Sequence, residues 1–204
     1  GSKGSTFREL PKNTIFDVSG SCIFFLKANQ NRNYVLAVLN SPVSYYALSC
    51  LNPTVSRQVG DIMRIPFSDT DDTGVDIISS LVESNIFIKK ELSSYKITEP
   101  RYKTNPIIFF SGSSLHDKLL EFLCYENSQL SLILLHEAII NQLIFDVYDL
   151  NPGDREQVET KMGKSIGELP VLTEARAAYL SITSIENETD QKFIQQLSMA
   201  TFTD

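Results

Sequence analysis

The sequence predicts an α+β protein, with a small mixed α/β domain in residues 1–70 and a mostly helical region behind it. Short runs of β-forming residues between turn residues occupy the front. Apolar residues at helical spacing dominate the remainder. The chain has 204 residues, 42% hydrophobic and 21% charged, which is enough to bury a core. We expect residues 71–113 to connect the two parts with one helix and irregular structure, and residues 114–204 to form the helical region.

Two segments of the front domain are expected to be strands. Residues 14–27 predict a β-hairpin, because two β-forming runs flank the turn Ser19-Gly20-Ser21. Val59–Phe67 predicts a short strand, which the Asp-rich segment after it ends. Between these strands we expect a polar loop, Lys27–Asn33, followed by helices.

Two helices are expected in that interval. Asn33 is a candidate N-cap for a helix that begins at Tyr34, since apolar residues then recur at helical spacing. Pro42 suits the first turn of a second helix. The dipeptide Asn52-Pro53 should end it, because the residue before a proline avoids the helical conformation.

The back of the chain is expected to hold one long helix and several short ones. The long helical pattern begins at Ser114 and reaches about Tyr148, with a break near Asn127-Ser128. Its apolar centre, LSLILL in residues 130–135, should be buried. Asn151-Pro152 predicts the start of another helix. The remaining helical candidates are residues 75–84, 173–180 and 190–198, and residues 93–113 are expected to be irregular.

The net charge of −7 is divided unevenly along the chain. Residues 1–70 carry seven Lys or Arg and four Asp or Glu, whereas residues 71–204 carry 11 and 21. The front is therefore mildly basic and the back strongly acidic. Different partners for the two halves would explain this division, and so would a simple drift of surface charge.

Cellular context is indicated by cysteines and hydropathy. Cys22, Cys50 and Cys124 lie far apart in apolar surroundings, which favours buried reduced thiols in a cytosolic protein. Uninterrupted apolar runs fall short of the roughly 20 residues of a membrane span. Gly1-Ser2 resembles a cloning remnant, so we expect an excised domain of a cytoplasmic protein rather than a whole one.

No catalytic or metal-binding constellation is found. His116 and His136 both fall in the long helical pattern, and neither belongs to a metalloprotease motif. Gly-rich phosphate loops and nucleophile-elbow motifs are absent from the sequence. The carboxylates Asp69, Asp71 and Asp72 suit a solvated turn better than a hard-cation site. The residues alone therefore predict a non-enzymatic chain without a metal or cofactor.

Three blocks carry a resemblance to a known family. They are KGSTFRELPKNTIFDVSGSCIFF (3–25), YVLAVLNSPVSYYALSCLNPTVSRQVGDIMRIPF (34–67) and INQLIFDVYDLNPGDREQV (140–158). Together they resemble the C-terminal target recognition region of adenine-specific DNA methyltransferases, of the BREX phage-defence PglX type and the single-chain type II restriction-modification type. The resemblance implies a target-recognition-like domain in residues 1–70 that binds double-stranded DNA.

This chain departs from the family in its catalytic motifs. The family's catalytic half carries an Asn-Pro-Pro-aromatic motif and an S-adenosylmethionine site. Asn52, Asn105 and Asn151 each precede a proline here, but none continues to a second proline and an aromatic residue. The resemblance thus implies a recognition module whose partners are DNA, the methyltransferase catalytic domain of the parent chain and other defence proteins.

Side chains suited to DNA contact occur in two places. Arg and Gln pair well with guanine and adenine edges, and a polar loop supplies phosphate contacts. The predicted DNA-contact residues are Lys27, Gln30, Asn31, Arg32, Asn33, Arg57 and Gln58. A structural role is the alternative, in which Gln58 satisfies backbone groups near Pro53 while Asp61 pairs with Arg57 or Arg64.

The leading functional hypothesis is a DNA target recognition domain of a methyltransferase or restriction-modification enzyme. The second is an interaction or scaffold module of the same parent, in which acidic helices dock the methyltransferase core or other defence subunits. A free-standing enzyme is the third, and the residue inventory disfavours it.

Overall fold

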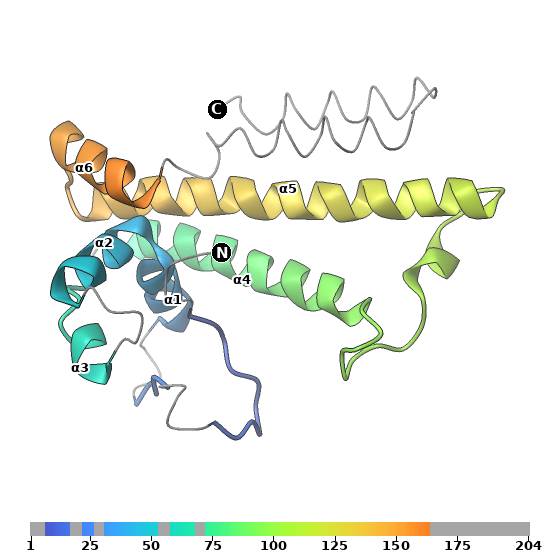
Figure 1. Ribbon diagram of the computed structural model, residues 1–204, viewed down its shortest axis with the longest axis horizontal. Coiled ribbons are helices and arrows are strands. Elements are labelled where there is room, and N and C mark those ends of the chain that lie inside the picture. Colours follow the sequence, from blue (N-terminus) through green and yellow to red (C-terminus); the bar gives the residue numbers. More distant parts are fainter. Residues whose placement is uncertain (1–6, 17–21, 27–30, 53–57, 68–71, 164–204) are drawn as a thin grey trace. The chain divides into compact units, whose positions relative to one another are not determined.

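A computed structural model describes residues 7–16, 22–26, 31–52, 58–67 and 72–163. All regular elements in these ranges are helices, shown in Figure 1. They are α1 (Arg32–Asn40), α2 (Pro42–Leu51), α3 (Val59–Ile62), α4 (Asp72–Ser94), the 3₁₀ helix η1 (Pro106–Phe109), α5 (Leu115–Val147) and α6 (Pro152–Met162). The helices expected in residues 173–180 and 190–198 lie outside the described ranges.

The predicted α+β class is wrong, because the described part of the chain is 67% helical and contains no strand. Residues 14–16 and 22–26, the described parts of the expected hairpin, have no regular structure. The hairpin's turn lies outside the described residues. The rings of Phe16 and Phe24 nevertheless lie in contact, with centroids 5.8 Å apart. Two short runs of β-formers are marginal without further strands to join, so propensity alone misled the prediction.

The strand predicted for Val59–Phe67 is also wrong. α3 forms its first turn, and hydrogen-bonded turns carry the chain on to Ile65. Asp61 Oδ2 accepts a hydrogen bond from the backbone N–H of Gln58 at 3.0 Å, an arrangement that starts a helix. Local capping therefore outweighs the β-tendency of Val and Ile, which depends on neighbouring strands.

The two helices predicted in the front domain are confirmed, but the N-cap of the first lies at a different residue. Pro42 lies in the first turn of α2, and Asn52 follows its last residue. Asn31, not Asn33, is the N-cap of α1. The two helices meet at a bend of 63° around Ser41.

The back helices are longer than the sequence pattern indicates. α4 extends the expected helix of residues 75–84 at both ends. α5 continues through Asn127-Ser128 without the predicted break. η1 lies in the segment predicted to be irregular, and α6 starts after Asn151 as predicted.

The described residues divide into two compact units. Unit 1 comprises Gly1–Ile86 together with Ile139–Lys164, and unit 2 includes Phe87–Ala138. Figure 1 shows α1, α2 and α3 of unit 1 gathered at the end of α5 from which α6 follows. The three-part organisation expected at residues 70 and 113 stays a prediction.

Unit 1 has two apolar cores that join distant parts of the chain. The larger combines α1, α4 and the end of α5, and its buried residues are Tyr34, Ala37, Val38, Ile78, Val82, Ile140 and Ile144. The smaller combines Leu39, Leu48 and Ile65, with Phe7 packed against them. Burial of this kind stabilises by roughly 1.5–3 kcal/mol for each large side chain.

Unit 2 has a smaller core, built from Ile88, Leu92 and Ile133. The expectation that residues 130–135 are buried is only partly right. Ile133 is buried, but Leu130 and Leu132 are 38% and 37% exposed. One stripe of the apolar run therefore faces the core.

The cysteines and the long apolar helices bear on the two predictions about cellular context. Cys22, Cys50 and Cys124 are free thiols, but the predicted burial is wrong because Cys50 is exposed and the others are half-buried. By length and composition α5 passes as a possible membrane span, and so does the bent pair of α1 and α2 taken as one segment. Core helices of soluble proteins pass the same test, so this finding assigns no location.

Candidate functional site

Four of the seven predicted DNA-contact residues fall within the described ranges. They are Asn31, Arg32, Asn33 and Gln58, all in unit 1. Lys27, Gln30 and Arg57 lie outside the described residues. The placed residues lie at the starts of α1 and α3. Asn31, Arg32 and Asn33 make side-chain contacts, and Gln58 is the N-cap of α3.

The two asparagines of the predicted contact loop have structural partners. Asn31 Oδ1 accepts a hydrogen bond from the backbone N–H of Tyr34 at 3.0 Å, which caps α1. The side-chain amide of Asn33 donates to the carbonyl of Ser79 at 3.3 Å and so joins α1 to α4. Both amides therefore contribute to the fold.

Arg32 is exposed and forms an ion pair. Its guanidinium lies 3.4 Å from a carboxylate oxygen of Glu9, and its side chain is 62% exposed. An exposed ion pair of this kind stabilises by at most about 1 kcal/mol. A phosphate group can therefore replace the carboxylate at small cost.

Gln58 precedes α3 and is exposed. Asp61 holds this corner: its Oδ2 accepts from Gln58 N–H at 3.0 Å and from the side-chain amide of Asn52 at 2.7 Å. This linkage joins the end of α2 to the start of α3. The pairing of Asp61 with Arg57 or Arg64 that the structural alternative assumed stays a prediction, because Arg57 lies outside the described residues.

Sequence reasoning missed a polar corner between α1 and α2. The side chain of Asn40 donates to the carbonyls of Phe7 and Leu36 and accepts from Phe7 N–H, each at 3.0 Å. Ser41 and Ser44 are fully buried, and both hydroxyls donate to the carbonyl of Val38. The signal was the polar Asn-Ser pair between two helical patterns, inside a resembling block.

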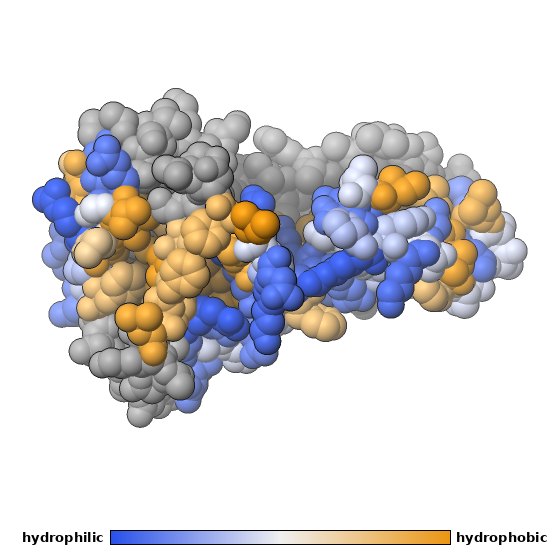
Figure 2. Space-filling view, turned by 90° about the horizontal axis from the view of Figure 1, so that it is seen from below, coloured by the Kyte–Doolittle hydropathy of each residue, from blue (hydrophilic) through white to orange (hydrophobic). Residues whose placement is uncertain are grey.

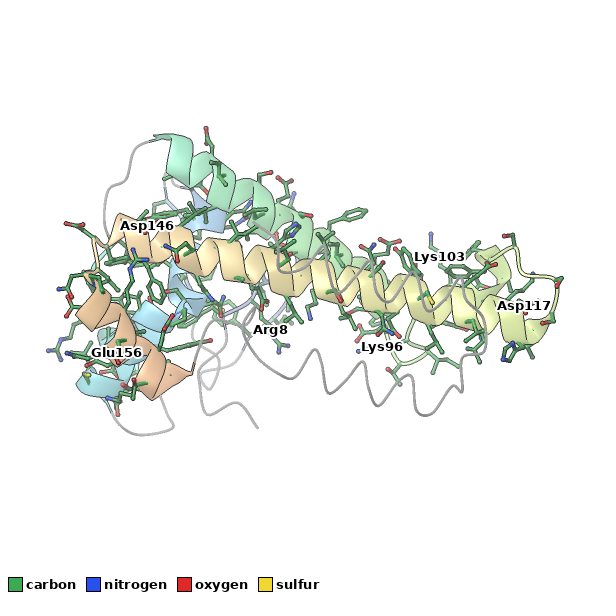
Figure 3. The ribbon with its side chains drawn as sticks, turned by 90° about the horizontal axis from the view of Figure 1, so that it is seen from above. Arg8, Lys96, Lys103, Asp117, Asp146 and Glu156 are labelled. Atoms are coloured by element: carbon green, nitrogen blue, oxygen red, sulfur yellow. The ribbon has the colours of Figure 1, made fainter. Side chains whose placement is uncertain are left out.

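A hydrogen bond connects two of the blocks that resemble the family, residues 34–67 and 140–158. Tyr148, directly after α5, donates its O–H to the carbonyl of Pro66. Arg155 of α6 pairs with Asp146 of α5, which Figure 3 labels, and stacks on the ring of Phe145 at 5.6 Å. The end of α5, α6 and the segment after α3 are thus tied together in unit 1.

The groups with shifted pKa values lie in unit 2. Burial lowers the pKa of His136, and it raises the pKa of Glu137 against the opposing charge of Lys89. Burial, together with hydrogen bonding to Glu91, also raises the pKa of Tyr95. Adjacent positions on a helix face different directions, so His136 and Glu137 do not form an acid–base pair.

Within the described ranges, no three His, Cys, Asp or Glu side chains gather closely enough to hold a metal ion. No protein-family model matches this chain, and comparison with curated proteins and with solved structures finds no match. The family resemblance therefore rests on the sequence blocks. The structure adds where those blocks lie.

Proposed function

We propose that this chain is a DNA target recognition module of an adenine-specific DNA methyltransferase or restriction-modification enzyme, without catalysis of its own. In this proposal its partners are double-stranded DNA and the catalytic domain of the parent protein in the bacterial cytoplasm. The parent's catalytic domain would bind S-adenosylmethionine and the flipped adenine.

One observation carries the proposal. Residues 34–67 and 140–158, the resembling blocks that are almost wholly described, fold into one compact unit although a long segment separates them in the sequence. Val38 and Ile144 share a core, and Tyr148 bonds to Pro66. The two blocks therefore belong to one folded unit. Their convergence supports a common origin with the family's recognition region.

Segment exchange in the full-length parent tests the proposal. Residues 14–67 would be replaced by the corresponding segment of a relative with a different target sequence. We expect the methylated adenine motif in the host genome to change to that of the donor. An active enzyme that keeps its original motif would show that this segment does not select the sequence.

A second candidate, an interaction module that docks the methyltransferase core or other defence subunits, is favoured by the surface of unit 1. Figure 2 shows apolar side chains gathered on the face of this unit that the view presents. Several large ones are strongly exposed: Ile15 (96%), Leu26 (92%), Met63 (80%) and Phe24 (67%). Exposed apolar surface of this extent is typical of sites at which one protein binds another.

Both candidates bind the parent's catalytic domain, and DNA binding distinguishes them. The substitutions Ile15→Ser and Met63→Ser should weaken that binding at any salt concentration, because burial of apolar surface drives it. DNA binding should instead weaken steeply as salt rises. An interaction module predicts the first behaviour without the second.

A further inference from the structure

The connection between α4 and α5 forms a loop whose base is held by aromatic rings. Tyr95, at the end of α4, meets Phe122 of α5 with ring centroids 5.9 Å apart. Phe110, at the other end of the connection, contacts Phe122 at 5.9 Å and Tyr125 at 6.0 Å. All four residues belong to unit 2. The two ends of the loop are therefore fixed against the same stretch of α5.

Polar contacts strengthen the same base. The hydroxyl of Tyr95 donates to Glu91 at 3.0 Å, and the backbone N–H of Ser111 donates to Glu121 at 3.1 Å. The two acceptors, the carboxylates of Glu91 and Glu121, belong to the same unit as the loop. Aromatic contacts and charged hydrogen bonds together make the loop a supported structure rather than a free tether.

Successive backbone turns shape the tip, residues 96–104. Lys96 N–H bonds to the carbonyl of Ser93 at 3.0 Å, Glu99 N–H to that of Lys96 at 2.9 Å, and Tyr102 N–H to that of Glu99 at 2.9 Å. Hydrogen bonds between residues three apart define turns that keep the backbone compact. The tip therefore presents its side chains from a fixed backbone.

Three positively charged side chains lie on this tip. Lys96, Arg101 and Lys103 are all exposed, and in the described part of the chain none of them forms an ion pair. Figure 3 labels Lys96 and Lys103, which come from the two ends of the tip. Glu99 is the one carboxylate between them. The net charge of the whole back region, which is strongly negative, conceals this local excess of positive charge.

We propose that the loop of residues 95–105 is a sequence-independent contact to the phosphate backbone of double-stranded DNA. This inference rests on the proposed recognition function and adds a second contact, in unit 2. Lys96, Arg101 and Lys103 replace counterions on the phosphates, and the exposed side chain of Ile97, at 79%, lies among them. Phosphate contacts position a protein on DNA, whereas base contacts select the sequence.

Salt-dependent DNA binding by the 204-residue chain tests the loop. The probe is a fluorescein-labelled duplex of about 20 base pairs, about two helical turns, in two unrelated sequences, with anisotropy measured over a series of NaCl concentrations. The triple variant Lys96→Gln, Arg101→Gln, Lys103→Gln should bind both duplexes more weakly. The slope of log K against log salt should become shallower by about 2–3, since each lost phosphate contact contributes about 0.9.

The control variant Lys89→Gln, Lys90→Gln, Lys118→Gln removes the same number of charges from unit 2 outside the loop. We expect it to keep the original slope, and circular dichroism to show unchanged helix content for both variants. Equal effects of the two variants would overturn the loop assignment in favour of overall charge. If the 204-residue chain binds DNA and the loop variant keeps the same affinity and salt slope, the loop assignment is overturned and the recognition function is retained. A chain that binds neither duplex at low salt would overturn the loop contact, whereas the segment exchange in the parent decides the recognition function separately.

Discussion

Asn40 illustrates how single polar side chains organise unit 1. Its side-chain amide donates to the carbonyl of Phe7 and accepts from the N–H of Phe7. These two hydrogen bonds attach the segment around Phe7 to α1 in the way that backbone hydrogen bonds join two strands. The buried hydroxyls of Ser41 and Ser44 both donate to the carbonyl of Val38, which also accepts the backbone N–H of Ser41 at the end of α1. Buried polar groups of this kind stabilise a fold only while all of their partners are present.

Replacement of Asn40 should separate its donor and acceptor roles. Asn40→Ala should lower the free energy of unfolding by about 1–3 kcal/mol, because the Phe7 backbone loses its partners. Asn40→Asp should cost at least as much, since a carboxylate faces the carbonyls of Phe7 and Leu36. Urea denaturation measures both values. Equal stability of the three proteins would show that this corner carries no stabilisation.

Glu137 should make stability depend on pH. Burial raises its pKa in the folded state above the ordinary value of 4.5, so the folded state binds the proton more tightly than the unfolded state. Stability therefore falls as pH rises from that ordinary value through the folded pKa. Glu137→Gln should be more stable than the natural chain at pH 8, and the difference should shrink below about pH 4.5.

Thermal unfolding of both proteins between pH 4 and pH 8 measures this effect. The exposed residue Glu99 supplies the matched control, because Glu99→Gln removes the same charge from the surface of the same unit. A Glu137→Gln difference that stays constant across this range would contradict the assigned burial.

Among the elements, α5 shows how a helix start can require a particular residue. Ser113 and Ser114 bond to the carboxylate of Asp117, and these bonds hold the pKa of Asp117 below its usual value. A carboxylate in the first turn also suits the helix dipole. Gly112 lies so close to this turn that an added Cβ would stand 2.6 Å from Lys118 N and 2.8 Å from the carbonyl carbon of Asp117. Backbone atoms cannot move aside as a flexible side chain can.

Gly112→Ala should therefore destabilise unit 2 by about 1–3 kcal/mol. Gly60 in α3 is the matched control, since a Cβ there would meet nothing within 4 Å. Gly60→Ala should be neutral or stabilise by up to about 1 kcal/mol, because alanine favours the helix. Chemical denaturation that ranked the two substitutions in the opposite order would contradict this description of the α5 start.

Across the whole molecule, the two units have separate cores. Ile144 is fully buried in unit 1, and Ile133 is 2% exposed in the core of unit 2. α4 and α5 contribute residues to both units. Local stability should consequently differ between the two parts of each long helix.

Hydrogen exchange measured by mass spectrometry tests this division. Ile144→Ala should cost about 2–5 kcal/mol and lower protection mainly in α1, the N-terminal part of α4 and the C-terminal part of α5. Ile133→Ala should lower protection mainly in the second half of α4 and the first half of α5. Uniform loss of protection after either substitution would show a single cooperative unit instead.

The sequence predicted the helices well where local signals are strong. Asn151-Pro152 marked the start of α6, and Pro42 marked α2, because capping and proline geometry act within a single turn. The cap of α1 was misplaced by two residues, since Asn31 and Asn33 are equally suited by type and only the path of the chain distinguishes them. Both predicted strands failed for the opposite reason: strand formation depends on partners far away in the sequence.

Local sequence was thus sufficient for the approximate positions of α1, α2 and α6, marked by proline and asparagine, and for the blocks that resemble a methyltransferase recognition region. It was not sufficient for α3, which was predicted to be a strand. Tertiary structure alone decided which blocks meet. It joined α1, α4 and the end of α5 in one core, and it turned Asn31, Asn33 and Asn40 into structural hydrogen-bonding groups. It also held the ends of the basic loop against α5 through Tyr95, Phe110 and Phe122. Helix signals act over neighbouring residues, whereas burial, polar partners and surface charge depend on contacts between distant segments, and a linear sequence does not display those contacts.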